Sequence, residues 1–354
     1  MNVMQILGAI LLATGLGATG TPELQDILDD MRESQDLPGV SAVVVRPDEV
    51  LFAGASGYAD LESQRPVTAD SVFYAGSLSK VLTAALVLNL VENELLSLED
   101  PVPGISYGSG VTVTHLLTHS SGLSREGDFG YWFSADFPDS ASLATYLATT
   151  ALRTRPGESL HYSNVGYAAL GPVVEHATGQ AFAEALRVRL LAPLQMGTTG
   201  ARGPAPGVTN GYTPPGRIIP SPERPFAGVG HKVGERHVRM YHDARAMSPA
   251  FGAYTSASDL GRLAQFLLGN RGDQVLSLSM RATMFLQQAS GWGLGIRIER
   301  YRGRRVARHG GWFAAHRSHL LLDIDNGIGV VVMGNGDNAD TESIANALLE
   351  AAQP

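Results

Sequence analysis

The stretch Phe73-Tyr-Ala-Gly-Ser77-Leu-Ser-Lys80 decides the fold prediction, because a strongly apolar run, Val81 to Leu88, follows it at once. This run predicts a helix from Ser77 to about Glu94. Ser77 and Lys80 are three residues apart, so both side chains project to the same side of the first turn. The positive end of the helix dipole favours an oxyanion near Ser77. Apolar neighbours of Lys80 would lower its pKa toward that of a useful base. A serine that caps the helix and a solvated lysine would show the same spacing. Whether Ser77 and Lys80 are functional must therefore be inferred from other residues.

Composition narrows the function classes. The 354 residues suffice for one large domain or two. The net charge of −8, without a long Lys/Arg run, argues against nucleic acid or an anionic membrane as the main partner. The absence of cysteine excludes disulfides, thiolate catalysis and Cys-ligated zinc.

The first twenty residues resemble a secretory signal. A short apolar segment ends near Ala13, and Ala18-Thr-Gly20 offers a small-x-small cleavage site before Thr21. The segment is too short for a comfortable transmembrane helix. We therefore expect a signal peptide over residues 1–20, no stable membrane span, and export to the periplasm or the medium.

The same region contains a second pattern. Gly15 to Gly20 fits G-x-G-x-x-G after an apolar run, which is the order of a dinucleotide-binding fingerprint. The fingerprint also needs an acidic residue about 20 positions later, at the end of a second strand. Asp48 and Glu49 come too late, and a hairpin follows instead of a crossover, so nucleotide binding is disfavoured.

Predicted strands lie at both ends of the chain. A first pair, Val40 to Val45 and Val50 to Gly54, follows a helix that begins at Pro22. Helices dominate the middle, and the end of the chain alternates strands with turns. The C-terminal strands are expected over residues 292–298, 305–309, 319–324 and 328–333, before a last helix over 338–351. Residues 200–249 are rich in turn formers, which predicts a long excursion bordering a binding cleft.

This arrangement predicts an α+β fold with two lobes. A sheet assembled from the N- and C-terminal segments, flanked by helices, would hold residues 21–75 and 285–354. A mostly helical central lobe would hold residues 76–284. The cleft between two lobes is the natural place for an active site.

Tyr162 and Asn164 open a predicted helix over residues 165–178. The phenol of Tyr162 could shuttle a proton if the Lys80 ammonium lowered its pKa. Asn164 has both a donor and an acceptor, which suits it to orient Lys80 and a substrate carbonyl. A polar helix start with tyrosine as filler is the structural alternative.

A third motif, His309-Gly-Gly311-Trp312, ends a predicted strand. Paired glycines allow a ligand to approach the strand edge closely. The N–H groups of Trp312 and Ser77 could together form an oxyanion hole. A tight turn would show the same residues.

Two other patterns are set aside. His115 and His119 have the i, i+4 spacing of a zinc helix but lack its glutamate and a third ligand, so we expect capping and packing roles. Gly104 to Gly108 fits G-x-S-x-G, yet a turn-rich loop precedes it where a nucleophile elbow needs a strand.

The order S-x-S-K, Y-S-N and H-G-G resembles the class C β-lactamase family, which also includes DD-peptidases, D-aminopeptidases and esterases. The resemblance extends from about Pro38 to Met333 and includes the segments His115 to Leu123 and Ala253 to Leu260. It implies a β-lactamase/transpeptidase-like fold with an antiparallel sheet. It also implies two-step acyl transfer without metal or cofactor.

The resemblance assigns roles by position. Ser77 matches the acylated nucleophile, Lys80 its base partner, and Tyr162 the residue that relays protons to the leaving group. The matching substrate-binding and orienting residues are Asn164, His309, Gly311 and Trp312, with the Ser77 and Trp312 amides as the oxyanion hole.

One departure from the family bears on the substrate. Class C β-lactamases usually have K-T-G where this chain has His309-Gly310-Gly311. A neutral histidine holds a carboxylate less firmly than lysine, and glycine contributes no hydroxyl. We expect a small-molecule ester, amide or peptide substrate ahead of a penicillin. A catalytically silent, penicillin-recognising scaffold or peptide-binding protein is the alternative; the presence of every reactive position favours an enzyme.

Overall fold

The computed structural model describes residues 22–102, 104–106, 110–134, 136–201, 203, 207–215, 229–239, 243–269, 272–288 and 291–353. The expected signal peptide over residues 1–20 and the glycine pattern inside it lie outside this part. In the described ranges no helix has the length and apolarity needed to cross a membrane.

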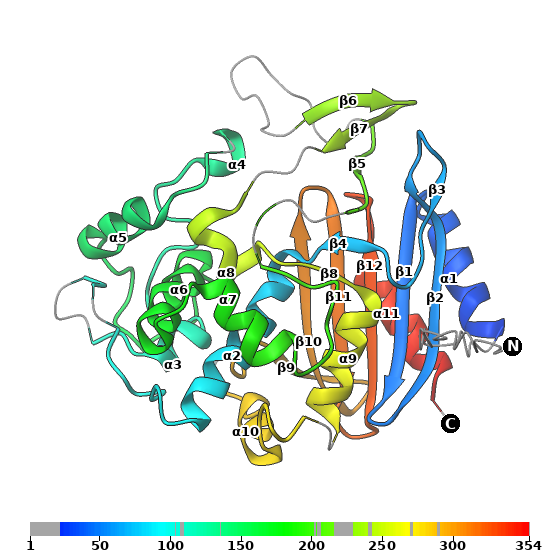
Figure 1. Ribbon diagram of the computed structural model, residues 1–354. Helices are drawn as coiled ribbons and strands as arrows, with labels where there is room; N and C mark the ends of the chain where they lie inside the picture. The colour runs from blue at the N-terminus through cyan, green and yellow to red at the C-terminus, as the bar shows by residue number, and fades with distance from the viewer. Residues whose placement is uncertain are drawn as a thin grey trace, which may run out of the picture.

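A seven-stranded antiparallel sheet forms the centre of the molecule, in the order β3-β2-β1-β12-β11-β10-β9 (Figure 1). The first β-strand of the chain, β1, pairs with the last, β12, from Val40 opposite Gly334 to Val45 opposite Gly329. Both ends of the chain therefore build one sheet, as predicted. The strands are β1 (Gly39–Arg46), β2 (Glu49–Asp60), β3 (Arg65–Pro66), β9 (Arg297–Tyr301), β10 (Arg304–Phe313), β11 (His316–Asp323) and β12 (Ile328–Gly334).

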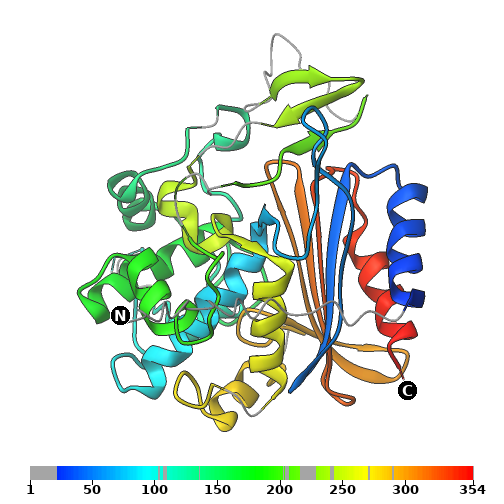
Figure 2. The ribbon, with the colours of Figure 1, turned by 45° about the vertical axis from the view of Figure 1, so that its right-hand side comes forward.

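Helices cover both faces of this sheet (Figure 2). The terminal helices α1 (Pro22–Ser34) and α11 (Thr341–Ala351) pack on one face, and α9 (Ala257–Leu268) packs on the other. Strand β1 shows the alternation that this requires: Val40, Ala42 and Val44 join the core under α1 and α11, while Val43 and Val45 join the core under α9.

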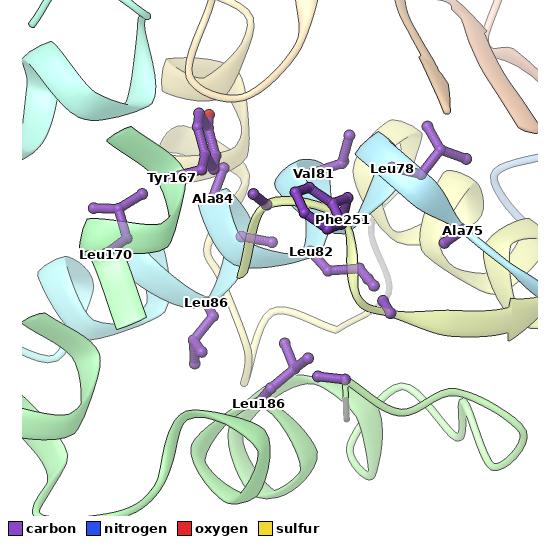
Figure 3. Packing of buried hydrophobic residues seen from close by; sticks show 14 of the residues in the cluster. Ala75, Leu78, Val81, Leu82, Ala84, Leu86, Tyr167, Leu170, Leu186 and Phe251 are labelled. Carbon is purple, nitrogen blue, oxygen red and sulfur yellow. The ribbon is translucent and has the colours of Figure 1, made fainter. Parts of the chain in front are cut away.

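The helical lobe surrounds α2 (Ser79–Glu92), in which twelve of fourteen residues are buried (Figure 3). A helix buried on all sides needs apolar residues all round, which explains why Val81 to Leu88 shows no amphipathic stripe. The other helices are α3 (Val113–Leu117), α4 (Tyr131–Ser134), α5 (Ser140–Thr149), α6 (Asn164–Thr178), α7 (Phe182–Leu186), α8 (Ser248–Phe251) and α10 (Leu278–Met284). The lobe boundaries expected at residues 75 and 285 stay predictions.

The structure differs from the predicted elements in three places. Strand β9 begins only at Arg297, and β10 continues past His309 to Phe313 because β11 pairs with it along that length. The stretch 200–249 contains a small sheet in the order β5-β7-β6 (Gly211–Thr213, Arg236–Arg239, Val229–Val233). None of its described residues lines the cavity at Ser77, and Asp243, Arg245 and Pro249 line a separate pocket, so the expected place beside a binding cleft stays a prediction. A further pair of strands is β4 (Val72–Tyr74) with β8 (Tyr254–Ser256), and β4 leads into the turn that holds Ser77.

The burial of α2 predicts a large effect of truncating its side chains. Leu86 is fully buried, so Leu86→Ala should lower the free energy of unfolding by about 2–5 kcal/mol through lost burial and the cavity left behind. Leu95→Ala is the matched control because Leu95 is 43% exposed, and it should cost less than about 1 kcal/mol. Urea unfolding measures both; equal losses would contradict the position of α2.

Candidate active site

Ser77 lies in the turn between β4 and α2, half-buried at the mouth of the helix. Gly76 has φ +54°, a left-handed conformation that glycine adopts without strain. The Ser79 hydroxyl donates to the Gly76 carbonyl (2.6 Å) and accepts from the Ala253 amide (3.0 Å). These bonds fasten the turn to the segment that leads into β8 and so fix the direction of Ser77.

Lys80 is completely buried one turn into α2. Its Nζ lies 2.7 Å from Asn164 Oδ1, 2.8 Å from the Ala250 carbonyl oxygen and 3.4 Å from Ser77 Oγ. Burial holds the pKa of Lys80 well below its ordinary value, while the negative charge of Glu126 acts in the opposite direction. The effect expected from the apolar neighbours is therefore present.

Tyr162 directly precedes Ser163, whose side chain caps α6. Lys80 Nζ lies over its ring at 4.8 Å from the centroid. The condition considered for Tyr162, a pKa lowered by this neighbour, is not met. Burial raises the pKa of Tyr162 to about 12, against the opposing effects of its hydrogen bond with Ser77 and of the charge of Arg125. The resting side chain is a neutral phenol.

Strand β10 brings Gly311 and Trp312 against the turn that holds Ser77. A Cβ atom at Gly311 would lie 2.1 Å from the Ala75 carbonyl oxygen and 3.1 Å from Ser77 N, and one at Gly76 would lie 2.4 Å from Trp312 N. The two segments thus meet backbone to backbone, with the main-chain nitrogens of Ser77 and Trp312 at the contact. The Trp312 indole donates to Asp337, which leaves its main-chain amide as the candidate donor.

His309 is a neutral imidazole with a fixed tautomer. Its Nδ1 donates to the Gly310 carbonyl (2.7 Å), since a carbonyl oxygen only accepts. Burial, aided by the charge of Lys80, lowers the pKa of His309 to about 3. Nε2 therefore has a lone pair instead of a proton, and it has no partner among the described residues.

A cavity of about 460 Å³ opens at Ser77. Its wall includes five of the predicted residues, Ser77, Tyr162, His309, Gly311 and Trp312, while Lys80 and Asn164 stand behind Ser77. Trp292 also lines it, with its ring 5.4 Å from that of His309 and 5.8 Å from that of Tyr162. Sequence reasoning missed Trp292 because no motif surrounds it.

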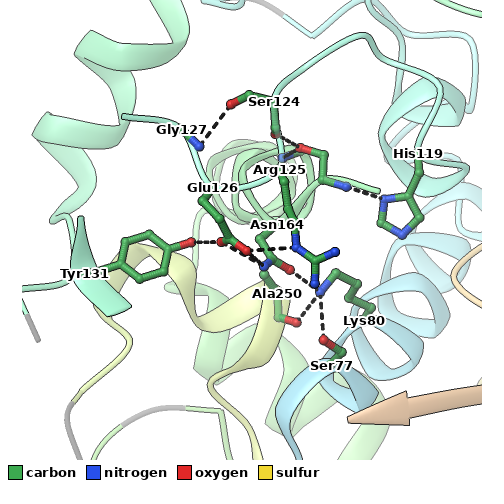
Figure 4. Close-up of polar contacts among 12 residues, drawn as sticks. Ser77, Lys80, His119, Ser124, Arg125, Glu126, Gly127, Tyr131, Asn164 and Ala250 are labelled. Atoms are coloured by element: carbon green, nitrogen blue, oxygen red, sulfur yellow. Dashed lines mark hydrogen bonds and ion pairs between the residues drawn. The ribbon is translucent and has the colours of Figure 1, made fainter. Parts of the chain in front are cut away.

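Glu126 was also missed, and it is the hub of the polar network behind Ser77 (Figure 4). Asn164 Nδ2 lies 2.9 Å from each Glu126 carboxylate oxygen. Arg125 Nε donates to the same carboxylate at 3.1 Å, and the Tyr131 hydroxyl also donates to it. A glutamate next to an arginine in a loop gives no signal in a single sequence.

The two histidines set aside as zinc ligands have separate roles. His115 forms a capping box with Thr112 at the start of α3, as expected. His119 packs its ring 4.2 Å from that of Tyr162, and its Nδ1 accepts from the Ser163 amide at 3.1 Å. His119 thus supports the predicted site.

The close contact at Gly311 predicts a sharp difference between neighbouring glycines. Gly311→Ala should lower kcat/KM on the order of 100-fold, because the new methyl group displaces the turn that holds Ser77. Gly310→Ala is the matched control, since its Cβ would meet its nearest atom at an ordinary 3.6 Å. Steady-state kinetics with thermal unfolding checks both; equal activities would contradict the contact.

The chain resembles known proteins both in sequence and in fold. The Beta-lactamase family model matches residues 24–353. Esterase EstB of Burkholderia gladioli is 31% identical over 70% of this chain and 70% of its own, and D-aminopeptidase of Gluconobacter oxydans is 26% identical over 89% and 58%. The solved D-amino acid amidase of Ochrobactrum anthropi, with L-phenylalanine amide, superposes with a TM-score of 0.79 at 22% identity, over 93% of this chain and 97% of its own, which shows a shared fold. The chain belongs to the β-lactamase family.

Proposed function

We propose that this protein is a serine hydrolase that cleaves an ester or amide bond through an acyl-enzyme on Ser77. One observation supports this most strongly: Lys80 Nζ lies 3.4 Å from Ser77 Oγ while two other acceptors hold it in place. Two relatives are named esterase and D-aminopeptidase, and these names refer to the cleavage of ester and amide bonds.

The hydrogen bonds of Lys80 suit a neutral amine. A neutral amine has two N–H bonds, and Asn164 Oδ1 and the Ala250 carbonyl accept both. The remaining lone pair then points to the Ser77 hydroxyl. The lowered pKa of Lys80 agrees with this state. Lys80 is thereby a base ready to take the Ser77 proton.

The proposed reaction conserves every proton. Ser77 Oγ attacks the substrate carbonyl carbon and its proton passes to Lys80 Nζ, while the main-chain amides of Ser77 and Trp312 stabilise the oxyanion. As the bond to the leaving group breaks, the neutral Tyr162 phenol protonates that group, and Lys80 returns a proton to Tyr162. Water then hydrolyses the acyl-enzyme by the reverse proton path.

The wall of the cavity favours substrates without a carboxylate. The unprotonated Nε2 of His309 accepts hydrogen bonds and repels anions. Three of the arginines that line the cavity have carboxylate partners: Arg297 and Arg308 pair with Glu299, each at 3.0 Å, and Arg125 pairs with Glu126. Arg317 donates to the main-chain carbonyl of Asp337 at 3.1 Å. Neutral esters and peptide-like amides therefore fit the site better than penicillins do.

This preference predicts the outcome of a direct comparison. We expect kcat/KM for a short-chain p-nitrophenyl ester to exceed that for nitrocefin. His309→Lys should raise the nitrocefin value by about tenfold or more, since a hydrogen bond to a charged group contributes about 1.5–3 kcal/mol. Hydrolysis assays with both substrates on both proteins measure this.

Ser77→Ala is the control, and it should abolish both activities and the labelling of Ser77 by a fluorophosphonate. A far higher value for nitrocefin in the wild type would refute the preference. Absence of labelling and turnover would instead support the silent, peptide-binding alternative.

The pKa values predict the pH profile of kcat/KM. Activity needs neutral Lys80, so it rises with pH through the pKa of Lys80, which burial places well below the ordinary lysine range. Activity also needs the protonated Tyr162 phenol, so it is lost only near pH 12. The profile should show no falling limb at the ordinary tyrosine pKa of about 10. Rates measured from pH 5 to 11 check this, and a fall near pH 10 would exclude the assignment.

A further inference from the structure

We propose that Glu126 is a positioning residue for the reaction: it fixes the orientation of the Asn164 amide and, through it, the direction of the Lys80 lone pair. This inference rests on the proposed function. It starts from the contact of Asn164 Nδ2 with both Glu126 oxygens, at 2.9 Å each.

An asparagine side chain has nearly the same shape in its two flipped orientations, so its neighbours decide which end faces which group. A carboxylate only accepts, so Glu126 requires Nδ2 on its own side. Oδ1 is then forced to face Lys80, where it accepts at 2.7 Å. In the flipped orientation Nδ2 would compete for the Lys80 lone pair and take it from Ser77.

The carboxylate of Glu126 is occupied by the protein on both oxygens. Oε1 accepts from Asn164 and from Arg125 at 3.1 Å, and Oε2 accepts from Asn164 and from the Tyr131 hydroxyl. Glu126 is not among the described residues that line the Ser77 cavity. Glu126 therefore acts on the amide of Asn164 and not on the substrate.

The segment that holds Glu126 is fastened to the start of α6. The main-chain N–H of Asn164 donates to the Arg125 carbonyl at 2.8 Å, and the Ser163 hydroxyl donates to the Ser124 carbonyl at 2.7 Å. On its other side Tyr131 is 1% exposed and stacks on Phe137, with ring centroids 4.9 Å apart. Glu126 thus has little freedom, which a positioning role requires.

Glu126→Gln tests the inference, because its amide can donate as well as accept and so permits the flipped Asn164. We expect kcat on a p-nitrophenyl ester to fall on the order of 100-fold, the lower end of what a positioned base contributes, with KM little changed. The negative charge of Glu126 raises the pKa of Lys80, so its removal lowers that pKa. The rising limb of the pH profile should therefore move to lower pH. The pH dependence of fluorophosphonate labelling at Ser77 gives the same limb independently of substrate.

Two variants separate orientation from charge. Glu126→Asp keeps the charge but is too short to hold Asn164 in the same place, so it should lose kcat while the limb stays in position. Tyr131→Phe keeps both the charge and the Asn164 contact, so its kcat should fall on the order of tenfold at most, because the lost hydrogen bond does not involve Asn164 or Lys80. Thermal unfolding confirms that each variant folds.

Wild-type kcat and an unmoved limb in Glu126→Gln would overturn the inference. A change in KM alone would also overturn it, because it would make Glu126 a substrate contact. If the wild-type protein itself showed neither labelling nor turnover, the proposed function would fail first, and that result needs no Glu126 variant.

Discussion

The structure depends on the burial of one amine. Lys80 lies fully inside the helical lobe, where a polar group without partners is costly. Its partners come from three separate parts of the chain: Ser77 at the start of α2, Asn164 at the start of α6, and the Ala250 carbonyl in α8. The packing of these helices is therefore inseparable from the chemistry, since any shift of one of them leaves a buried polar group unpaired.

The two lobes make different contributions. The helical lobe holds Lys80, Asn164 and Glu126 in a hydrogen-bonded network behind Ser77, and it contributes Tyr162 to the cavity wall. The sheet contributes the cavity wall through β10. Strand β9 pairs with β10 only up to Arg308, so from His309 onward this edge of β10 is not covered by β9. Glycine at position 311 lets this edge touch the nucleophile turn directly. The helical lobe and the sheet thus contribute different parts of the candidate site.

The fold and the meeting of the three motifs at one cavity were predictable because their signals are local or periodic. Apolar runs gave the strands at both ends, and the three short motifs located Ser77, Tyr162 and His309 in one site. Glu126 and Trp292 were not predictable, since their roles arise only from contacts far along the chain. The lowered pKa considered for Tyr162 is not found, because a sequence can suggest a neighbouring charge but does not show the depth of burial that raises the pKa.

The pairing of β1 with β12 has a consequence for biosynthesis. β1 leaves the ribosome long before its partner β12, so β1 lacks one of its two neighbours in the sheet until β12 has been translated. The same delay applies to β10, which completes the wall at Ser77. Ser77, the proposed nucleophile, is therefore synthesised long before the strand that completes its cavity. Contacts so distant in sequence also slow folding, because a long stretch of chain must be ordered before they can form.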